Sequence, residues 1–375
     1  MNKKIRPIIK WTGGKFDEFS FFANQIPSFT RYIEPFFGGG GVFFALQPNV
    51  ASFINDKSTD LFNFYVHLSD ENFKTELFKY VSAWEALGDL NTLLWDTSSN
   101  DFKTFISGAN AYNDLKDNLS NHIKFAIPKI SQLFDIEFIV DAKSFETKLL
   151  ASILDKAKRI KRISDKEGRS FSESELQNHF ETGIRSGFYL FFRNLLNQQY
   201  TKSIQLSPAK TVANWYFVRE FCYASMFRFN SKGEFNIPYG GIAYNKKNFR
   251  QKVSNVFDDS IANLFKNVSI SNLDFEDFLN TIDLKPNDFI FLDPPYDSEF
   301  SEYDQNSFSQ SDQKRLASFL IKTNAKWMVV IKETDFIRNI YTHPNINITT
   351  FDKNYTYNVR GRNNRSVTHL IVTNY

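Results

Sequence analysis

The stretch that decides the fold is RYIEPFFGGGGVFFAL, residues 31–46. Its short apolar start, residues 31–33, leads through a Glu-Pro-Phe-Phe turn into four glycines, and residues 42–46 then favour a helix. Residues 51–56 indicate a second strand, and an apolar stripe of helical spacing follows over residues 61–66. This order predicts a βαβ unit, and therefore a parallel sheet with right-handed crossovers.

The same rhythm of strands and helices returns towards the C-terminal end. Short apolar runs suited to buried strands lie at residues 267–273, 288–292, 326–331 and 369–373. The region between, residues 69–255, has longer patterns of helical period, and residues 228–241 alternate around a Lys-Gly turn in the manner of a β-hairpin. We expect a Rossmann-like α/β domain with a doubly wound, mostly parallel sheet, formed by residues 1–68 and 256–375 and interrupted by a mainly helical insertion, residues 69–255.

Composition excludes several classes of protein. The 375 residues suffice for two or three domains, and an aromatic fraction of 17% excludes disorder for most of the chain. With a net charge of only +3, an anionic partner would have to be met by local basic patches. Because Cys222 is the single cysteine and the five histidines lack ligand spacing, we expect no disulfide and no metal site. We expect a cytoplasmic protein, neither exported nor membrane-spanning, because we find neither an apolar signal core nor 18 successive apolar residues.

The glycine run, residues 38–41, indicates a ligand site. In a doubly wound sheet such a turn lets the backbone approach a ligand, while the following helix offers free N–H groups. Asp56, at the end of the next strand, stands where a carboxylate holds a ribose diol, although an aspartate there also suits a helix N-cap. Together these features favour a nucleoside-containing cofactor.

The sharpest motif is Asp293-Pro294-Pro295-Tyr296, directly after the predicted strand 288–292. Two prolines cannot continue a strand ladder, so the chain leaves the sheet rigidly at its carboxyl end, where ligands bind in open α/β sheets. A carboxylate, a carbonyl and an aromatic ring are thereby fixed side by side. They can accept two hydrogen bonds from an amino group while the ring stacks on a planar heterocycle. The alternative is a plain strand-ending turn with a packed tyrosine.

With the Glu-Pro-Phe-Phe-Gly-Gly-Gly loop and the opening segment, residues 8–15, this motif resembles the Dam-type, D12-class DNA adenine methyltransferases. The resemblance implies S-adenosylmethionine as the cofactor, double-stranded DNA as the substrate, a methyltransferase domain in the discontinuous α/β part, and target recognition by the helical insertion. Residues 84–187 depart from the family's pattern. The candidate cofactor-binding residues are Trp11, Lys15, Glu34, Phe36, Gly38, Gly40, Asp56, Asp274, Phe275 and Asp293.

Candidate DNA contacts come from three segments. Residues 228–240 resemble the family's DNA-contacting hairpin, and residues 358–365 place three arginines in a glycine-containing loop, for which a solvated loop is the default. The candidates are Lys10, Arg228, Asn230, Asn236, Pro238, Tyr239, Arg360 and Arg362. A further basic run, residues 156–162, is either a solvated helix face or a strip that contacts phosphates.

Asp293, Pro294 and Tyr296 are the candidate catalytic residues. Hydrogen bonds from an adenine amine to the Asp293 carboxylate and the Pro294 carbonyl would localise the nitrogen lone pair in line with the sulfonium methyl. Transfer is then a direct displacement, in which Asp293 orients the amine and needs no raised pKa. Because the amine is paired inside a duplex, the base must be flipped out, and stacking on Tyr296 offsets part of that cost.

We therefore predict a site-specific adenine DNA methyltransferase, the modification half of a restriction–modification system with a cognate endonuclease as candidate partner, or a phage-borne relative. An RNA or cytosine-N4 amino-methyltransferase would use the same chemistry. A catalytically silent DNA-binding protein on the same scaffold is a third possibility, against which the intact residues 293–296 argue.

Overall fold

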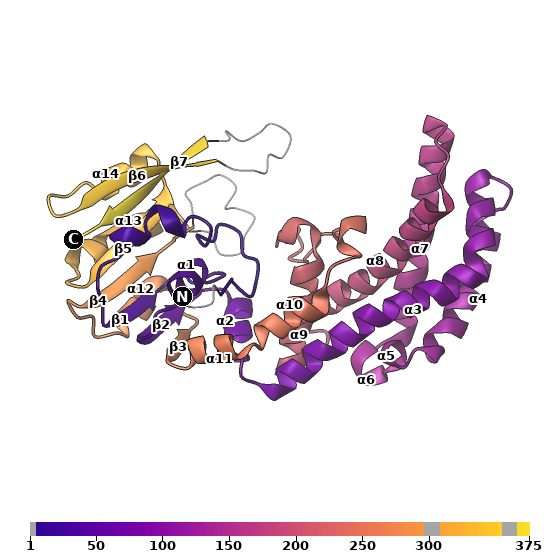
Figure 1. The fold of residues 1–375 in the computed structure, drawn as a ribbon, viewed down its shortest axis with the longest axis horizontal. Coiled ribbons are helices and arrows are strands. Elements are labelled where there is room, and N and C mark those ends of the chain that lie inside the picture. Colours follow the sequence, from indigo (N-terminus) through magenta and orange to yellow (C-terminus); the bar gives the residue numbers. More distant parts are fainter. Residues whose placement is uncertain (1–4, 296–307, 355–365) are drawn as a thin grey trace. The chain divides into compact units, whose positions relative to one another are not determined.

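One seven-stranded sheet is formed by the described residues of the computed structural model, which are 5–295, 308–354 and 366–375 (Figure 1). The strands are β1 (Arg31–Glu34), β2 (Ala51–Asn55), β3 (Val268–Ser271), β4 (Asp288–Leu292), β5 (Lys326–Lys332), β6 (Asn347–Asn354) and β7 (Ser366–Thr373). Their order is β3-β2-β1-β4-β5-β7-β6, and the pairs from β3 to β5 are parallel, whereas β7 is antiparallel to β5 and β6. The prediction of a mostly parallel α/β sheet is confirmed.

This sheet belongs to the α/β unit, Met1–Ser69 with Phe257–Tyr375, and the rest of the chain, Asp70–Val256, is the helical unit. The helices of the α/β unit are α1 (Gly41–Leu46), α2 (Thr59–Val66), α11 (Asp259–Phe265), α12 (Phe275–Asn280), α13 (Gln310–Lys322) and α14 (Asp335–Ile340). Two short 3-10 turns, Phe19–Phe21 and Ala23–Gln25, precede β1.

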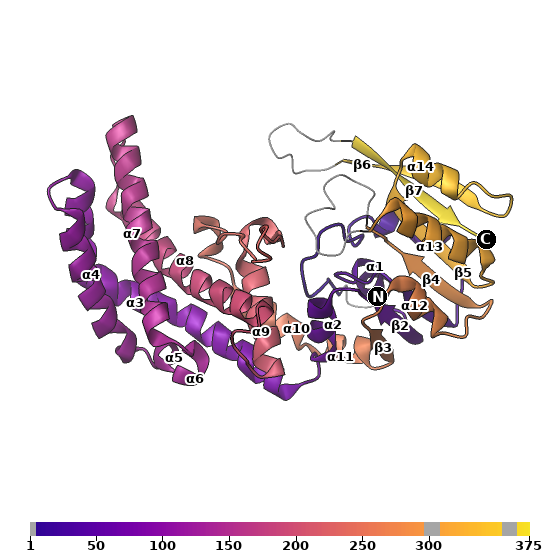
Figure 2. The same cartoon turned by 180° about the vertical axis from the view of Figure 1, so that it is seen from behind.

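Both faces of the sheet are buried, which explains the apolar character of its strands. On one face, Ile290 and Leu292 of β4 pack with Trp327 of β5 against α12, α13 and α14 (Figure 2). On the other, alternating face, Phe291 stacks on Phe22 with ring centroids 5.8 Å apart. Neighbouring rings of Phe29, Tyr32, Phe43 and Phe289 continue this aromatic layer. Aromatic side chains therefore fill the core on this side of the sheet.

The helical unit is built around one long helix. Its helices are α3 (Glu71–Ser107), α4 (Tyr112–Ala126), α5 (Ser131–Phe134), α6 (Ile136–Ile139), α7 (Ala142–Glu167), α8 (Glu173–Tyr200), α9 (Pro208–Phe221) and α10 (Phe249–Val256). With 37 residues, α3 is about 55 Å long. Glycines on α8 allow α7 to pack closely, because a Cβ at Gly187 would lie 2.7 Å from the Leu149 Cα. The expectation of a mainly helical region is confirmed in these elements.

The predicted hairpin at residues 228–241 is present as a short pairing around its turn, where the Asn230 amide donates to the Glu234 carbonyl and the Asn236 amide donates to the Arg228 carbonyl. One isolated antiparallel bridge joins Phe229 to Phe235, and no extended ladder forms among the described residues. The outer edge of the returning segment, residues 235–237, bonds to side chains of α8: Tyr189 donates to the Ile237 carbonyl at 2.8 Å, and Asn197 accepts from the Phe235 amide at 2.8 Å. Side chains of α8 therefore satisfy the backbone groups that face away from residues 228–230.

Every helix in the described part of the chain is too short or too polar to span a lipid bilayer.

Candidate active site

Four acidic residues follow neighbouring strands of the sheet. Glu34 ends β1, Asp56 follows β2, Asp274 comes shortly after β3, and Asp293 directly follows β4. The carboxyl ends of parallel strands lie at one edge, so the four residues share that edge. From β1 the chain proceeds to β2 on one side, whereas from β4 it proceeds to β5 on the other. This makes the edge between β1 and β4 the topological switch point, where ligands bind in doubly wound sheets.

Asp293 is held by a buried lysine. The Nζ of Lys15 lies 2.5 Å from the Oδ1 of Asp293 and donates a second hydrogen bond to the Gly13 carbonyl at 2.9 Å. The Lys15 side chain is 1% exposed and that of Asp293 is 18% exposed. The Oδ2 of Asp293 has no partner within the described residues. The ion pair therefore fixes one carboxylate oxygen and leaves the other to a ligand.

Burial raises the pKa of Asp293 above its ordinary value, and the Lys15 ammonium opposes that rise. With its side chain 1% exposed, Lys15 is part of the interior of this edge and not an ordinary surface lysine.

The corner after Asp293 is braced from α13. Pro294 is buried and Pro295 is exposed. Gln313, with no exposed surface, donates from Nε2 to the Pro295 carbonyl at 2.9 Å. Sequence reasoning missed Gln313, although a signal was present: it is a polar residue on the apolar stripe formed by Leu316, Ala317 and Leu320.

Glu34 is the second buried acid of the edge. Its side chain is 2% exposed, and it accepts a hydrogen bond from the hydroxyl of buried Tyr32 at 2.8 Å. Burial raises the pKa of Glu34 well above its ordinary value; the Tyr32 hydrogen bond opposes this, and the charges of Asp293 and Asp56 add to it. The protonated form of Glu34 is thus favoured where two further carboxylates are near.

Replacement of Glu34 by glutamine is expected to remove a pH dependence of stability. Because the folded state raises the pKa of Glu34, its protonated form stabilises the fold fully below about pH 4.3, and this contribution is lost as the pH rises through the raised pKa. In that interval, the free energy of unfolding of the wild type should fall relative to Glu34→Gln by about 1.4 kcal/mol per pH unit. Urea unfolding of both proteins at several pH values measures this, and parallel curves would contradict it.

Asp56 organises the glycine loop. Its Oδ2 accepts from the Gly38 amide at 2.7 Å and its Oδ1 accepts from the Ser58 amide at 2.8 Å. The N-cap of α2 is Ser58, whose hydroxyl accepts from the Leu61 amide, so the N-cap alternative for Asp56 is wrong. Asp56 thus joins the end of β2 to the glycine loop.

The glycines of this loop are required by packing of the opening segment. A Cβ at Gly39 would lie 2.9 Å from the Cβ of Trp11, and one at Gly41 would lie 2.8 Å from the backbone nitrogen of Lys15. Gly38 and Gly40 also have positive φ, at 51° and 67°. The loop therefore brings Trp11 and Lys15 to the edge that carries Asp293.

Asp274 and Phe275 are tied to a cation on α13. Asp274 caps α12 by accepting from the Glu276 amide, and it also accepts from Arg315 at 3.0 Å. The guanidinium of Arg315 lies 4.5 Å from the ring centroid of Phe275, which is buried and packs on Phe36 at 5.5 Å. Next to this pair, Leu273 exposes 40% of its side chain. Sequence reasoning missed Arg315, for which it offered no signal.

Asn55 ties three strand ends together and was also missed. Its side chain is buried, donates to the carbonyls of Pro35 at 3.1 Å and Leu273 at 3.0 Å, and accepts from the Leu273 amide at 2.9 Å. An asparagine that closes an apolar strand just before Asp56 was the available signal.

The candidate DNA contacts have different surroundings. Arg228, Asn236 and Pro238 are exposed in the helical unit, and Lys10 is exposed in the α/β unit. Tyr239 is 7% exposed and donates to the Asn245 side chain at 3.0 Å, so it belongs to the core of its unit. Asn230 uses its side-chain oxygen inside the turn, where it accepts from the Lys232 and Glu234 amides at 2.9 Å. Tyr296, Arg360 and Arg362 lie outside the described residues.

A search for a metal site gave no cluster of three or more His, Cys, Asp or Glu side chains suited to an ion in the described ranges.

Comparison with known proteins shows that the N-terminal and the C-terminal parts of the chain match one and the same family. The model of the D12 class N6 adenine-specific DNA methyltransferase family matches residues 11–134 and 116–357. The chain is 27% identical over 362 residues to the type II methyltransferase M.MjaIII of Methanocaldococcus jannaschii. This match covers 92% of this chain and 90% of that protein. It is 23% identical over 386 residues to the type II methyltransferase M1.LlaDCHI of Lactococcus lactis subsp. cremoris. This second match covers 99% of this chain and 96% of that protein.

A third relative matches more strongly over a shorter region. The type II methyltransferase M.CviBI of Paramecium bursaria Chlorella virus NC1A is 34% identical over 169 residues, or 44% of this chain and 60% of that protein. The family model itself extends over most of the chain. The chain therefore belongs to the D12 class of N6 adenine-specific DNA methyltransferases.

Proposed function

We propose that this chain transfers the methyl group of S-adenosylmethionine to the N6 amine of an adenine flipped out of a specific duplex DNA sequence, as the modification half of a restriction–modification system. The observation that carries this proposal is the rigid corner at the β1–β4 switch point, where Asp293 has one oxygen held by Lys15 and one left for a ligand. Relatives named as type II methyltransferases support the restriction–modification setting and a cognate endonuclease as partner.

The residues at this edge fit S-adenosylmethionine in charge and polarity. Two carboxylates, Asp56 and Asp293, stand at this edge beside the Lys15 ammonium, so the edge keeps a net negative charge even with Glu34 protonated, which suits a ligand that carries a sulfonium and an ammonium group. The exposed apolar side chain of Leu273 offers a surface to the adenine ring of S-adenosylmethionine. When bound, S-adenosylmethionine supplies an electrophilic methyl group at this edge.

We assign to that ligand the ten candidate residues predicted from the sequence, and their placement suggests different tasks. Lys15 and Asp56 hold Asp293 and the glycine loop in position. The loop packs on Trp11 and so shapes the edge. The rings of Phe36 and Phe275 pack on each other and make this part of the edge apolar. Contacts with the ligand itself are part of the proposal.

The target amine meets acceptors on the corner. The free oxygen of Asp293 and the carbonyl of Pro294 each accept one N–H of the amine, which localises its lone pair and aims it at the methyl group. Neither acceptor forms a covalent bond to the substrate. We assign stacking of the flipped base to Tyr296, which offsets part of the few kcal/mol that flipping costs.

The test is a methyl-transfer assay with tritiated S-adenosylmethionine on duplex DNA, followed by methylation-sensitive sequencing of DNA from cells that express the chain. We expect label in N6-methyladenine at one sequence context. Label in cytosine or in RNA would show that adenine in DNA is not the substrate. DNA binding without any methyl transfer would show a catalytically silent DNA-binding protein.

A further inference from the structure

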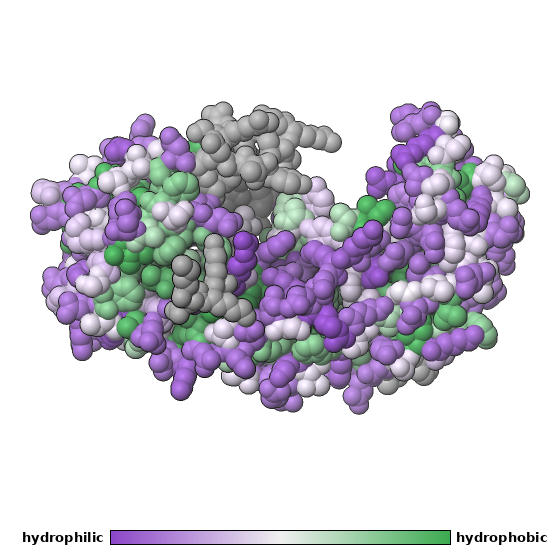
Figure 3. All heavy atoms as spheres, viewed as in Figure 1, coloured by the Kyte–Doolittle hydropathy of each residue, from purple (hydrophilic) through white to green (hydrophobic). Residues whose placement is uncertain are grey.

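A basic hollow on the helical unit contains part of the basic run, residues 156–162. It has a volume of about 420 Å³ and is lined by Phe105 at the end of α3 and by five residues of α7: Lys158, Lys161, Arg162, Asp165 and Lys166. Four of these five side chains are cations. Hydrophilic residues dominate the projecting end where α7 packs with α8 (Figure 3).

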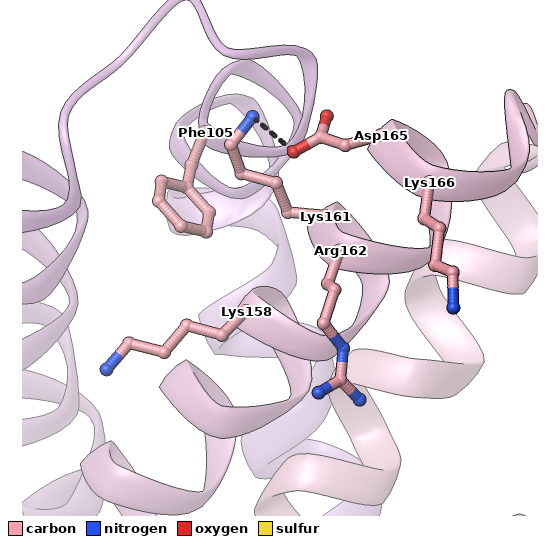
Figure 4. Close-up of a pocket in the computed structure, with 6 residues that line it drawn as sticks. All are labelled: Phe105, Lys158, Lys161, Arg162, Asp165 and Lys166. Atoms are coloured by element: carbon pink, nitrogen blue, oxygen red, sulfur yellow. Dashed lines mark ion pairs between the residues drawn. The ribbon is translucent and has the colours of Figure 1, made fainter.

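Only part of this charge is neutralised within the unit. Lys161 turns towards Asp165, with 3.4 Å between Nζ and Oδ2 (Figure 4). Its Nζ would also lie 3.4 Å from a Cβ at Gly108, which places it at the C-terminal end of α3, where a cation is favoured. Arg162 and Lys166 point away from the Asp165 carboxylate and have no acidic partner within 4.0 Å in the described parts of the chain.

An aromatic ring braces the first cation of the row. The Lys158 ammonium lies 4.1 Å from the ring centroid of Tyr112 at the start of α4. Lys158 is exposed, as are Arg162 and Lys166. The ring therefore restrains a lysine that remains accessible to an anion.

The spacing of the cations is unfavourable for the helix alone. Lys158, Arg162 and Lys166 stand four residues apart on α7, and like charges at that spacing destabilise a helix. Partial burial lowers the pKa of His179 on α8, and the charges of Lys156 and Arg159 lower it further. The positive charge of α7 therefore reaches α8 as well.

We propose that this basic row, Lys158 with Arg162 and Lys166, binds the phosphate backbone of the duplex DNA substrate. The inference rests on the proposed function, because duplex DNA is the polyanion that the enzyme must hold. The row spans eight residues, or about 12 Å of helix, which matches three to four nucleotides at about 3.4 Å each along one strand. Contacts to phosphates carry no sequence information, so the row adds affinity and orientation.

The test measures DNA affinity of the full chain against salt concentration. The variant Lys158→Ala/Arg162→Ala/Lys166→Ala removes three cations of the row. The matched control, Lys124→Ala/Lys143→Ala/Lys148→Ala, removes the same charge from two exposed positions and one half-buried position, Lys148, all at least ten residues, or about 15 Å, along their helices from Lys158 and Tyr112. Binding of a duplex that contains the methylation site is measured between about 50 and 200 mM salt.

We expect the slope of log K against log salt to become less negative by about 2 to 3 in the row variant, and its Kd for DNA to rise about tenfold or more. The control should change both far less. The KM for DNA should follow Kd, while kcat at saturating DNA and S-adenosylmethionine binding stay as in the wild type. A second variant, Arg162→Gln/Lys166→Gln, alters only side chains without an acidic partner and should reduce the slope by about 2.

Two failures are distinguishable. If the wild type transfers methyl groups but the row variant and the control have the same Kd and slope, the row does not bind DNA and the inference is wrong. If the wild type transfers no methyl group to duplex DNA, the proposed function is wrong, whatever the row does.

Discussion

Replacement of Asp293 by asparagine is expected to lower kcat for methyl transfer by at least about a hundredfold, the scale seen when one preorganised polar group is removed from a reacting centre. The carboxylate has one oxygen bonded to Lys15 and another available to the target amine. Asparagine retains one acceptor oxygen, and its amide nitrogen donates instead of accepting. Asparagine therefore cannot accept hydrogen bonds from both Lys15 and the target amine. Single-turnover transfer with saturating DNA and S-adenosylmethionine measures the effect on chemistry alone.

The asparagine variant is preferable to alanine because its amide oxygen still accepts the hydrogen bond of Lys15. Both variants remove the carboxylate that pairs with the buried Lys15 ammonium, but alanine also removes the acceptor, and a buried charge without a partner costs about 3 to 5 kcal/mol of stability. A matched control is Asp335→Asn, which removes one carboxylate from an exposed position of the same unit. An Asp293→Asn rate within a few-fold of the control would contradict the role of Asp293 as the acceptor.

The fold was predictable where burial dictates the sequence pattern. Strand β4 is buried at every position, and its apolar run gave its bounds as residues 288–292. Strand β6 escaped prediction because it is the edge strand of the sheet, and its residues 347–354 mix threonine and charged side chains with few apolar ones. The predicted strand 369–373 begins earlier, at Ser366, where its partner is β6. Because β6 was not predicted, the part of β7 that pairs only with β6 could not be predicted either.

The site was predictable where a motif is contiguous, and less so where the fold brings single residues together. Asp293 and Pro294 follow a strand directly, so their rigid exit from the sheet could be inferred. The pairing of Lys15 with Asp293 joins residues 278 positions apart, and only the resemblance pointed to it. Gln313 and Arg315 lie on α13, whose approach to the corner depends on the packing of the whole sheet.

The sequence placed the glycine loop correctly, but it indicated only one of the two reasons for which glycines are needed there. Its glycines were interpreted as room for a ligand, because the backbone must approach one closely in this type of turn. The structure adds a different requirement, since the space beside Gly39 and Gly41 is taken by Trp11 and Lys15. Packing between Gly39 and Trp11, 28 residues apart, and between Gly41 and Lys15, 26 residues apart, leaves the same glycine pattern as ligand binding. Spacing alone does not separate the two causes.

Replacement of Lys15 by methionine is expected to move the acid limb of the pH profile of kcat/KM upward by about 1 to 3 pH units. Burial already raises the pKa of Asp293, and the Lys15 ammonium is what opposes this. The ionised carboxylate is a stronger acceptor for the amine than the protonated carboxyl group, so activity falls as the pH drops through that pKa. Without the ammonium the fall begins at a higher pH. Profiles of both proteins between about pH 5 and 9 measure the shift, with S-adenosylmethionine and DNA affinities determined at each pH.

The shape of that profile separates charge from geometry. If Lys15 acts by holding Asp293 ionised, Lys15→Met should recover most of its activity at high pH, where the carboxylate ionises without help. Lys15→Gln keeps a hydrogen-bond donor without the charge, and it should show the same upward shift as methionine. An equal loss at every pH would instead mean that Lys15 only positions the corner and the segment around Gly13, to whose carbonyl it also donates. An unshifted acid limb with full activity would show that the ion pair has no part in catalysis.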